Sequence, residues 1–200
     1  MSLFNFSDLH EDEASALPEK GFAEVNRFEA NVKSIIIKNR QKLIDAIGDI
    51  KNGEDIFFIN QGRWSAHDLL LYLLSITGPA ALYFTAWAVS ENAARLIQSA
   101  VDNKLITEVH CVLDRRIEIR NDKVIATVRN FSNSIVFVDC HAKLFVLEND
   151  NWKVTILTTA NLSNNLRIEA GHIYTNSDIA TLVKNNILKI IKSGKPFEDE

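Results

Sequence analysis

Leu144-Phe-Val-Leu-Glu-Asn-Asp-Asn-Trp-Lys-Val-Thr-Ile-Leu-Thr158 holds two short apolar runs on either side of a polar tetrapeptide, Glu148-Asn-Asp-Asn151. Two strand-like runs joined by so short a polar connection are typical of a β-hairpin. The tripeptide His141-Ala-Lys143 leads directly into the first run. We predict a strand over residues 142–147. Because side chains two apart on a strand point to the same face, His141 and Lys143 should address one ligand together.

On both sides of this hairpin the chain alternates strand-like and helical runs. Such alternation is typical of an α/β sheet covered by helices. The predicted strands cover residues 55–60, 81–89, 108–113, 135–138, 142–147, 153–158 and 170–174. The predicted helices cover residues 25–50, 65–76, 91–103, 120–132 and 177–191. The helix over 65–76 should begin with a capping box, in which Ser65 and Asp68 exchange hydrogen bonds with each other's backbone.

Length and charge indicate one folded domain with acidic ends. The chain has 200 residues, of which 46% are hydrophobic, and a net charge of −4. That acidity lies mostly in residues 1–24 and at the C-terminus, so residues 25–197 carry a net charge of +4. We therefore expect an acidic arm over 1–24, a domain over 25–194 and an acidic tail over 195–200. A basic working face for a phosphate-bearing partner remains possible.

The two cysteines, Cys111 and Cys140, lie in apolar surroundings and do not form a CxxC motif. They are typical of buried thiols in a reducing compartment. The N-terminal residues lack a basic stretch leading into an apolar segment, and no apolar run approaches the length of a bilayer span. We expect a cytoplasmic protein without membrane insertion.

The hairpin and its surroundings carry a further pattern of polar residues. An acid, Glu148, follows the first strand that begins at His141-Ala-Lys143, and Thr158-Thr-Ala-Asn161 ends the second strand. Another acid, Glu169, lies downstream. This pattern resembles the phospholipase D superfamily, whose signature is an HxK motif, an acid after it, a GSxN-like turn and a downstream Glu. The departures are Thr158 for Gly, Glu148 for Asp and a hairpin three residues longer than the common spacing.

The resemblance implies a mixed β-sheet flanked by helices on both faces, as an αβα sandwich. It also implies that His141 attacks phosphorus to form a phosphohistidine, while Lys143 and Asn161 hold the nonbridging oxygens. Glu169 would orient an imidazole, and Glu148 and Thr159 would support the site. Neither a metal nor another cofactor is implied.

In this superfamily a second HxK motif supplies the acid for the leaving oxygen. The other histidines, which are His10, His67, His110 and His172, all lack a Lys two residues further on. A symmetric homodimer that places two His141 residues across a two-fold axis is the simplest solution, since the same patch then faces itself.

Two further stretches extend the resemblance and the candidate substrate groove. Asn60-Gln-Gly-Arg-Trp-Ser65, together with Thr85-Ala-Trp87, is similar to a subgroup of phospholipase D-like proteins from phage and mobile-element regions. Trp64 and Trp87 could stack on bases at a groove or pack in the core. Arg115 and Arg116 follow a predicted strand end, where ligand crevices of α/β sheets tend to lie, or belong to a solvated surface.

These patterns predict a phosphodiesterase acting on nucleic acid without a metal. Two alternatives remain at this stage. One is a catalytically silent relative that binds DNA or another phosphate-bearing ligand in the same pocket. The other is a hydrolase of phospholipid headgroups.

Overall fold

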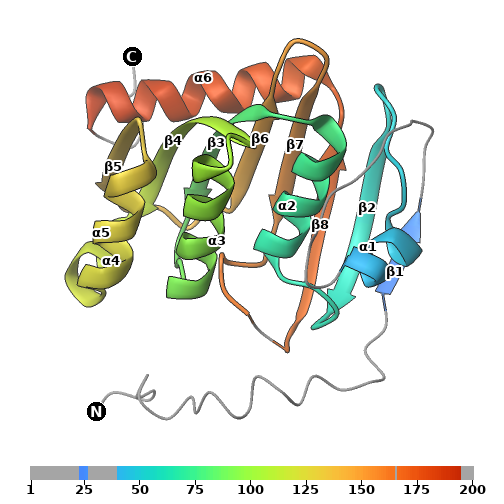
Figure 1. Ribbon diagram of the computed structural model, residues 1–200, viewed down its shortest axis with the longest axis horizontal. Helices are drawn as coiled ribbons and strands as arrows, with labels where there is room; N and C mark the ends of the chain where they lie inside the picture. Colours follow the sequence, from blue (N-terminus) through green and yellow to red (C-terminus); the bar gives the residue numbers. More distant parts are fainter. Residues whose placement is uncertain (1–22, 27–39, 165, 195–200) are drawn as a thin grey trace.

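The computed structural model describes residues 23–26, 40–164 and 166–194. The strands are β1 Ala23–Asn26, β2 Asp55–Gln61, β3 Ala80–Ala86, β4 Ile106–Asp114, β5 Ser134–Val138, β6 Leu144–Glu148, β7 Lys153–Thr158 and β8 Ile168–Tyr174. They form one eight-stranded sheet in the order β1-β2-β8-β7-β6-β3-β4-β5 (Figure 1). β3, β4 and β5 are parallel, and every other neighbouring pair is antiparallel. The sheet is therefore mixed.

Helices cover both faces of this sheet. They are α1 Arg40–Ala46, α2 Ala66–Thr77, α3 Glu91–Asp102, α4 Arg115–Arg120, α5 Asp122–Phe131 and α6 Ser177–Ser193. On β3, Leu82 and Phe84 pack into the main core with α1, α2, α3 and α5, whereas Tyr83 between them packs on the opposite face with Ala180 and Ile187 of α6. Alternate residues of a strand face opposite sides of the sheet. The predicted α/β fold with helices on both faces is confirmed.

The predicted hairpin is present, and its register is set by polar contacts at the turn. β6 and β7 pair from Leu144 opposite Leu157 to Glu148 opposite Lys153. At the turn, Asn149 Oδ1 accepts hydrogen bonds from the backbone N–H groups of residues 151 and 152, at 3.0 and 2.9 Å. An Asn side chain that bonds the backbone two residues further on favours a turn there. The end of the strand pair that carries the HxK motif lies opposite this turn.

Helix α2 begins as its sequence predicts. Ser65 is the N-cap; its hydroxyl accepts from the Asp68 N–H at 3.1 Å, and the Asp68 carboxylate accepts from the Ser65 N–H at 2.9 Å. Nearly every side chain of α2 is buried, because α1 and α3 flank the helix on its outer sides. Ser65 and its buried neighbour His67 therefore have a structural place in the core.

Three sequence predictions need correction. Residues 23–26 form the edge strand β1 rather than the start of a helix over 25–50, because their backbone pairs with β2. The helix is α1, and residues 27–39 lie outside the described part. The strand after the HxK motif starts at Leu144, not at residue 142. A short helix, α4, follows β4 directly, because Asp114 accepts from the Arg116 N–H and caps it.

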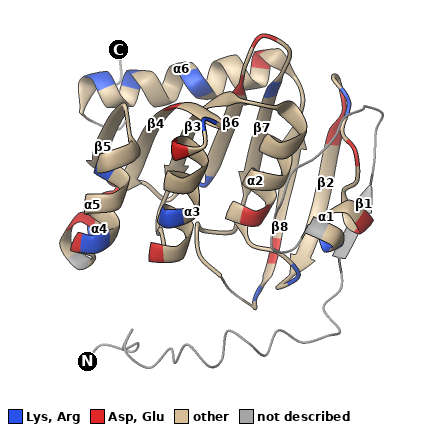
Figure 2. Ribbon diagram, in the orientation of Figure 1, with Lys and Arg blue, Asp and Glu red and all other residues tan. Residues whose placement is uncertain are grey.

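Several general properties can be stated for the described residues. None of their helices is both long and apolar enough to cross a membrane. Both cysteines are free thiols; Cys111 is buried, and Cys140 is only partly so. Acidic and basic residues are interspersed along α3, α4 and α6 rather than gathered on one element (Figure 2). Most of the predicted acidic arm and the whole acidic tail fall outside the described residues.

Candidate functional site

The fold brings the polar motifs to one edge of the sheet. His141 and Lys143 precede β6, and the Thr158–Asn161 turn follows β7. The Thr158 N–H donates to the Lys143 carbonyl at 3.1 Å, which extends the β6–β7 ladder by one bond. Thr158 also lies opposite Gly171 of β8. Glu169 is the second residue of that strand. Three segments separated along the chain therefore meet at this edge.

His141 and Lys143 are in contact, although they lie in an extended segment rather than in a strand. Lys143 Nζ lies 3.3 and 3.4 Å from the two ring nitrogens of His141 and donates to the His141 carbonyl at 2.6 Å. Lys143 is buried, while His141 is exposed. The contact places the Lys143 ammonium beside the imidazole ring of His141.

Burial and nearby acidic groups have opposite effects on the pKa of Lys143. Burial lowers the pKa of Lys143, because removal from water disfavours its charged form. Interactions with Cys140, Glu169 and Asp114 act in the opposite direction, and the net pKa is below the ordinary value for lysine. The surroundings of Lys143 therefore disfavour its charged form, and the nearby acidic groups offset only part of the effect of burial.

The Thr158–Asn161 turn is built by its own hydroxyl groups. Thr158 Oγ1 accepts from the Ala160 N–H at 3.1 Å and donates to the Ala170 carbonyl at 3.2 Å. Thr159 Oγ1 donates to the Glu169 carboxylate and accepts from the Ala170 N–H at 3.0 Å. Thr158 is buried, and its hydroxyl is used in these bonds within the protein.

Asn161 lies beside the end of β3. The next residue, Leu162, donates its N–H to the Ala88 carbonyl at 3.2 Å, which places the turn next to Trp87. The side-chain oxygen of Asn161 and the indole N–H of Trp87 are both buried without a hydrogen-bond partner. Two unpaired polar atoms in adjacent segments are unusual in a folded protein, and such atoms call for a specific explanation such as a bound ligand.

Trp87 is surrounded by the ionisable residues of the site. The His141 ring lies 5.4 Å from the Trp87 ring, edge to face, and Lys143 Nζ lies 5.7 Å from its centroid. The Arg116 guanidinium lies 5.2 Å from the same centroid. Arg116 is also held by Asp114, through Nε at 2.6 Å and Nη2 at 2.9 Å. Trp87 thus joins the HxK motif to the end of β4.

Asp114 is a residue whose role was missed by sequence reasoning. It is fully buried, and the hydrogen bonds from Arg116 are the main reason that its pKa falls to about 2. The Cys140 N–H also donates to Asp114, at 3.2 Å. The Asp-Arg-Arg triplet is visible in the sequence, but the contact with Cys140 joins residues far apart along the chain.

Other residues expected near the site lie elsewhere. Glu148 is at the turn end of the hairpin, where it pairs with Lys153 at 3.2 Å and Lys184 at 2.5 Å. Burial raises the pKa of Glu148, but these lysines outweigh it and the net shift is downward. Trp64 is 4% exposed and packs against Phe58 in the main core, so it cannot stack on a substrate. Arg115 forms an exposed ion pair with Asp139 at 2.9 Å.

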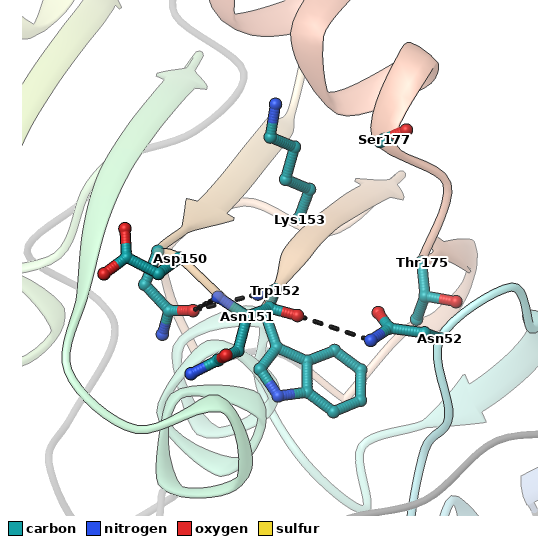
Figure 3. A pocket seen from close by; sticks show the side chains of 8 residues that line it. Asn52, Asp150, Asn151, Trp152, Lys153, Thr175 and Ser177 are labelled. Carbon is teal, nitrogen blue, oxygen red and sulfur yellow. Dashed lines mark hydrogen bonds between the residues drawn. The ribbon is translucent and has the colours of Figure 1, made fainter.

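A shallow pocket of about 220 Å³ lies at the turn end of the hairpin, away from the HxK motif. Figure 3 shows that Trp152, Lys153, Asn52 and Thr175 line it, with Asn52 donating to the carbonyl of Asn151 at 3.3 Å. No His or Cys side chain lines this pocket. Among the described residues as a whole, no group of three or more His, Cys, Asp or Glu side chains is arranged to hold a metal ion.

Comparison with known proteins identifies the fold. No family model matches the chain, and no curated protein sequence matches it. Among solved structures, a polyphosphate kinase from Porphyromonas gingivalis is similar with a TM-score of 0.50 and 16% sequence identity. The similarity covers 73% of this chain and 27% of the kinase chain, so the chain spans about a quarter of that protein. Polyphosphate kinase belongs to the phospholipase D superfamily.

TrmBL2, described as an archaeal chromatin protein with a novel mode of DNA binding, also matches. Its TM-score is 0.43 and its identity is 10%, over 60% of this chain and 46% of that chain. At 16% identity the similarity to the kinase describes the fold alone. The chain shares an α/β fold with the part of the kinase structure that it covers.

Proposed function

We propose that this protein is a phospholipase D-like phosphodiesterase that cleaves nucleic acid through a phosphohistidine intermediate. The observation that carries the proposal is the contact between Lys143 Nζ and the exposed His141 imidazole, at the edge where Asn161 and Glu169 also lie. A phosphodiester repels nucleophiles with its charged oxygens, so its cleavage needs a neutral nucleophile beside cationic and neutral donors. This edge of the sheet carries the proposed nucleophile, His141, and the donors Lys143 and Asn161.

In the proposed reaction, an unprotonated ring nitrogen of His141 forms a bond to phosphorus. The bond from phosphorus to the leaving oxygen breaks, and that oxygen takes a proton from the imidazolium of the partner's His141. Water then attacks the phosphohistidine and gives a proton back to the partner's His141. The P–N bond breaks with its electron pair returning to His141, so a diester and water become a monoester and an alcohol.

The other residues bind and orient. Lys143 and Asn161 hold the nonbridging oxygens, where charge accumulates as the nucleophile attacks. Glu169 supports the site as an acceptor for an imidazole N–H, and its carboxylate is itself fixed by the Thr159 hydroxyl. This resembles the general device in which a carboxylate orients a catalytic His. Thr158 is buried, so its side chain leaves access to phosphate. A bulky side chain on the ligand side would block that access.

The proposed second subunit has a suitable surface beside the site. Phe57, His172 and Leu157 face one another across β2, β8 and β7, on the face of the sheet that also carries α6. Phe57 and Leu157 are 43% and 44% exposed, and Ile168, next to Glu169, is 61% exposed. Contiguous exposed apolar side chains mark interaction sites. A second copy is the proposed occupant, because the same strands lead into a site that has only half of the required histidines.

The test uses bis(p-nitrophenyl) phosphate and single- and double-stranded DNA, each in the presence of EDTA. His141→Ala should lower turnover on the order of 10³-fold or more, since it removes the nucleophile. His110→Gln is the matched control. His110 lies on β4, where it bonds Glu108 of the same strand and Ser134 of β5, and it has no place in the reaction.

DNA binding without turnover, unchanged by His141→Ala, would favour the catalytically silent relative instead. Thr158 in place of Gly is the feature that motivates that second candidate. Cleavage of dispersed phosphatidylcholine with no cleavage of DNA would favour the headgroup hydrolase.

A further inference from the structure

We propose that Arg116, positioned by Asp114 and Trp87, forms a second phosphate subsite beside the His141–Lys143 pair, so that the protein takes a strand with at least two phosphates. The inference rests on the proposed function, because it places the reacting phosphate at His141. It goes further by naming the residue that binds a second phosphate of the nucleic-acid strand.

Arg116 is held in place before any ligand binds. Its Nε and Nη2 donate to the two oxygens of Asp114, and its own backbone N–H donates to Oδ1 at 3.0 Å. A two-point pairing of this kind fixes the plane of a guanidinium. The low pKa of Asp114, about 2, keeps the carboxylate charged and the pairing intact at neutral pH. Little side-chain entropy would then be lost when a phosphate binds to Arg116.

The same carboxylate also positions the HxK motif. Asp114 Oδ2 accepts from the Cys140 N–H, and Cys140 immediately precedes His141. Arg116 and the backbone leading to the nucleophile are therefore attached to one buried group. A ligand that bridges them would meet two binding points with a fixed separation.

The separation of Arg116 and Lys143 has an upper limit, which is compatible with neighbouring phosphates. Arg116 and Lys143 lie over the same indole ring, so the two cations cannot be farther apart than the sum of their distances to its centroid, 5.2 and 5.7 Å. Along one strand of a duplex, phosphates follow at about 3.4 Å of helix axis. The two cations are therefore close enough for neighbouring phosphates of one strand to reach both.

Arg116 has donors left for this role. A guanidinium carries five N–H groups, and the bonds to Asp114 use two of them. The side chain is 48% exposed, so the remaining groups can reach a ligand. Arginine pairs readily with phosphate because its donors match the spacing of phosphate oxygens. Arg115 points instead to the exposed Asp139 and would contribute less.

The experiment compares Arg116→Gln with a matched control, Arg129→Gln. Arg129 also pairs with a carboxylate, Glu118 at 2.7 Å, and also lies over an aromatic ring, Phe137 at 5.5 Å, but it belongs to α5. We expect Arg116→Gln to lower kcat/KM for an oligonucleotide by about 10-fold or more. Its effect on bis(p-nitrophenyl) phosphate, which has one phosphate, should be under about 3-fold. Arg129→Gln should change neither.

Binding gives a second readout that does not need turnover. In a His141→Ala background, fluorescence anisotropy with a labelled single strand should show weaker binding for Arg116→Gln. The slope of log K against log salt should fall by about 0.7, the value for one phosphate contact. Arg116→Lys, which keeps a charge beside Asp114, serves if the Gln variant unfolds, and should show an intermediate loss of affinity.

Equal losses on both substrates, or an unchanged affinity and salt slope, would overturn the subsite. If the wild type cleaves neither substrate, the proposed reaction fails, while the anisotropy measurement still decides the subsite. The two failures are therefore distinguishable.

Discussion

Asp114 illustrates how one buried carboxylate can organise several residues. It accepts from the side chain and backbone of Arg116 and from the backbone of Cys140. A buried charge is tolerated only when it is paired and hydrogen-bonded, and these bonds meet that condition. The chemistry proposed for His141 depends on this support, although Asp114 itself has no part in the reaction.

A pH dependence of stability follows from the lowered pKa of Asp114. Its pKa falls from 3.8 to about 2 on folding, so the native state favours the charged form. That contribution is fully present above pH 3.8 and is lost as the pH falls toward 2. Asp114→Asn should destabilise the protein by about 2 kcal/mol near neutral pH, by weakening hydrogen bonds to a charged group. Urea denaturation across this pH range measures it.

The difference in stability between wild type and Asp114→Asn should shrink as the pH approaches 2. The exposed Asp49 offers a control, since Asp49→Asn should change stability little at any pH. A constant difference across the range would mean that the charge of Asp114 contributes nothing to folding.

At the level of secondary structure, β8 depends on a close approach at Gly171. A Cβ at this position would lie 2.4 Å from the Phe58 ring and 2.6 Å from the Leu157 carbonyl. The Phe58 ring can turn, but the carbonyl belongs to the β7 backbone and cannot move without disturbing the ladder. Gly171 thus lets β8 lie flat against β7 next to the Thr158–Asn161 turn.

Gly171→Ala should therefore lower the free energy of unfolding by about 1–3 kcal/mol, the usual cost of overpacking. For a chain of this size each kcal/mol lowers Tm by about 2–4 °C. Thermal denaturation followed by circular dichroism measures it. Phe58→Leu removes the ring and should rescue part of the loss in the double variant. Additive losses in that double variant would show that the Phe58 ring is not the obstacle.

At the scale of the whole molecule, the main question is how one chain with a single HxK motif completes the proposed reaction, which uses two histidines. The exposed row of Phe57 and Leu157 leads from β2 and β7 toward the site. An interface related by a two-fold axis uses the same patch on both subunits. A partner docked on this row would bring its own copy of the motif to the same edge of the sheet.

Leu157→Glu should convert the proposed dimer into monomers and abolish turnover, because it places a charge in the interface. Ile119→Glu is the control, since Ile119 is 79% exposed on α4 and lies away from that face. Light scattering measures the mass. If each active centre needs two His141 residues, activity in refolded mixtures of wild type and His141→Ala should fall with the square of the wild-type fraction. A linear fall, or dimers that persist in Leu157→Glu, would contradict the shared site.

Local pattern was sufficient to predict much of this fold. The hairpin, the capped start of α2 and the alternation of strands and helices all follow from periodicity and turn residues that lie close in sequence. The edge strand β1 was not predictable in this way. Four residues are too few to show a period, and their conformation depends on β2, more than twenty residues away.

The candidate site also combines features that the sequence determined with features that only the tertiary structure decided. The sequence by itself determined which reactive groups are available, His141, Lys143, Asn161 and Glu169, and that the motif occurs once. Only the tertiary structure decided that Trp64 is core, that Glu148 pairs with Lys184, and that Arg116 stands over Trp87. The reason is physical: residue type and spacing fix chemical capacity and local conformation, whereas burial and long-range pairing depend on how distant segments pack.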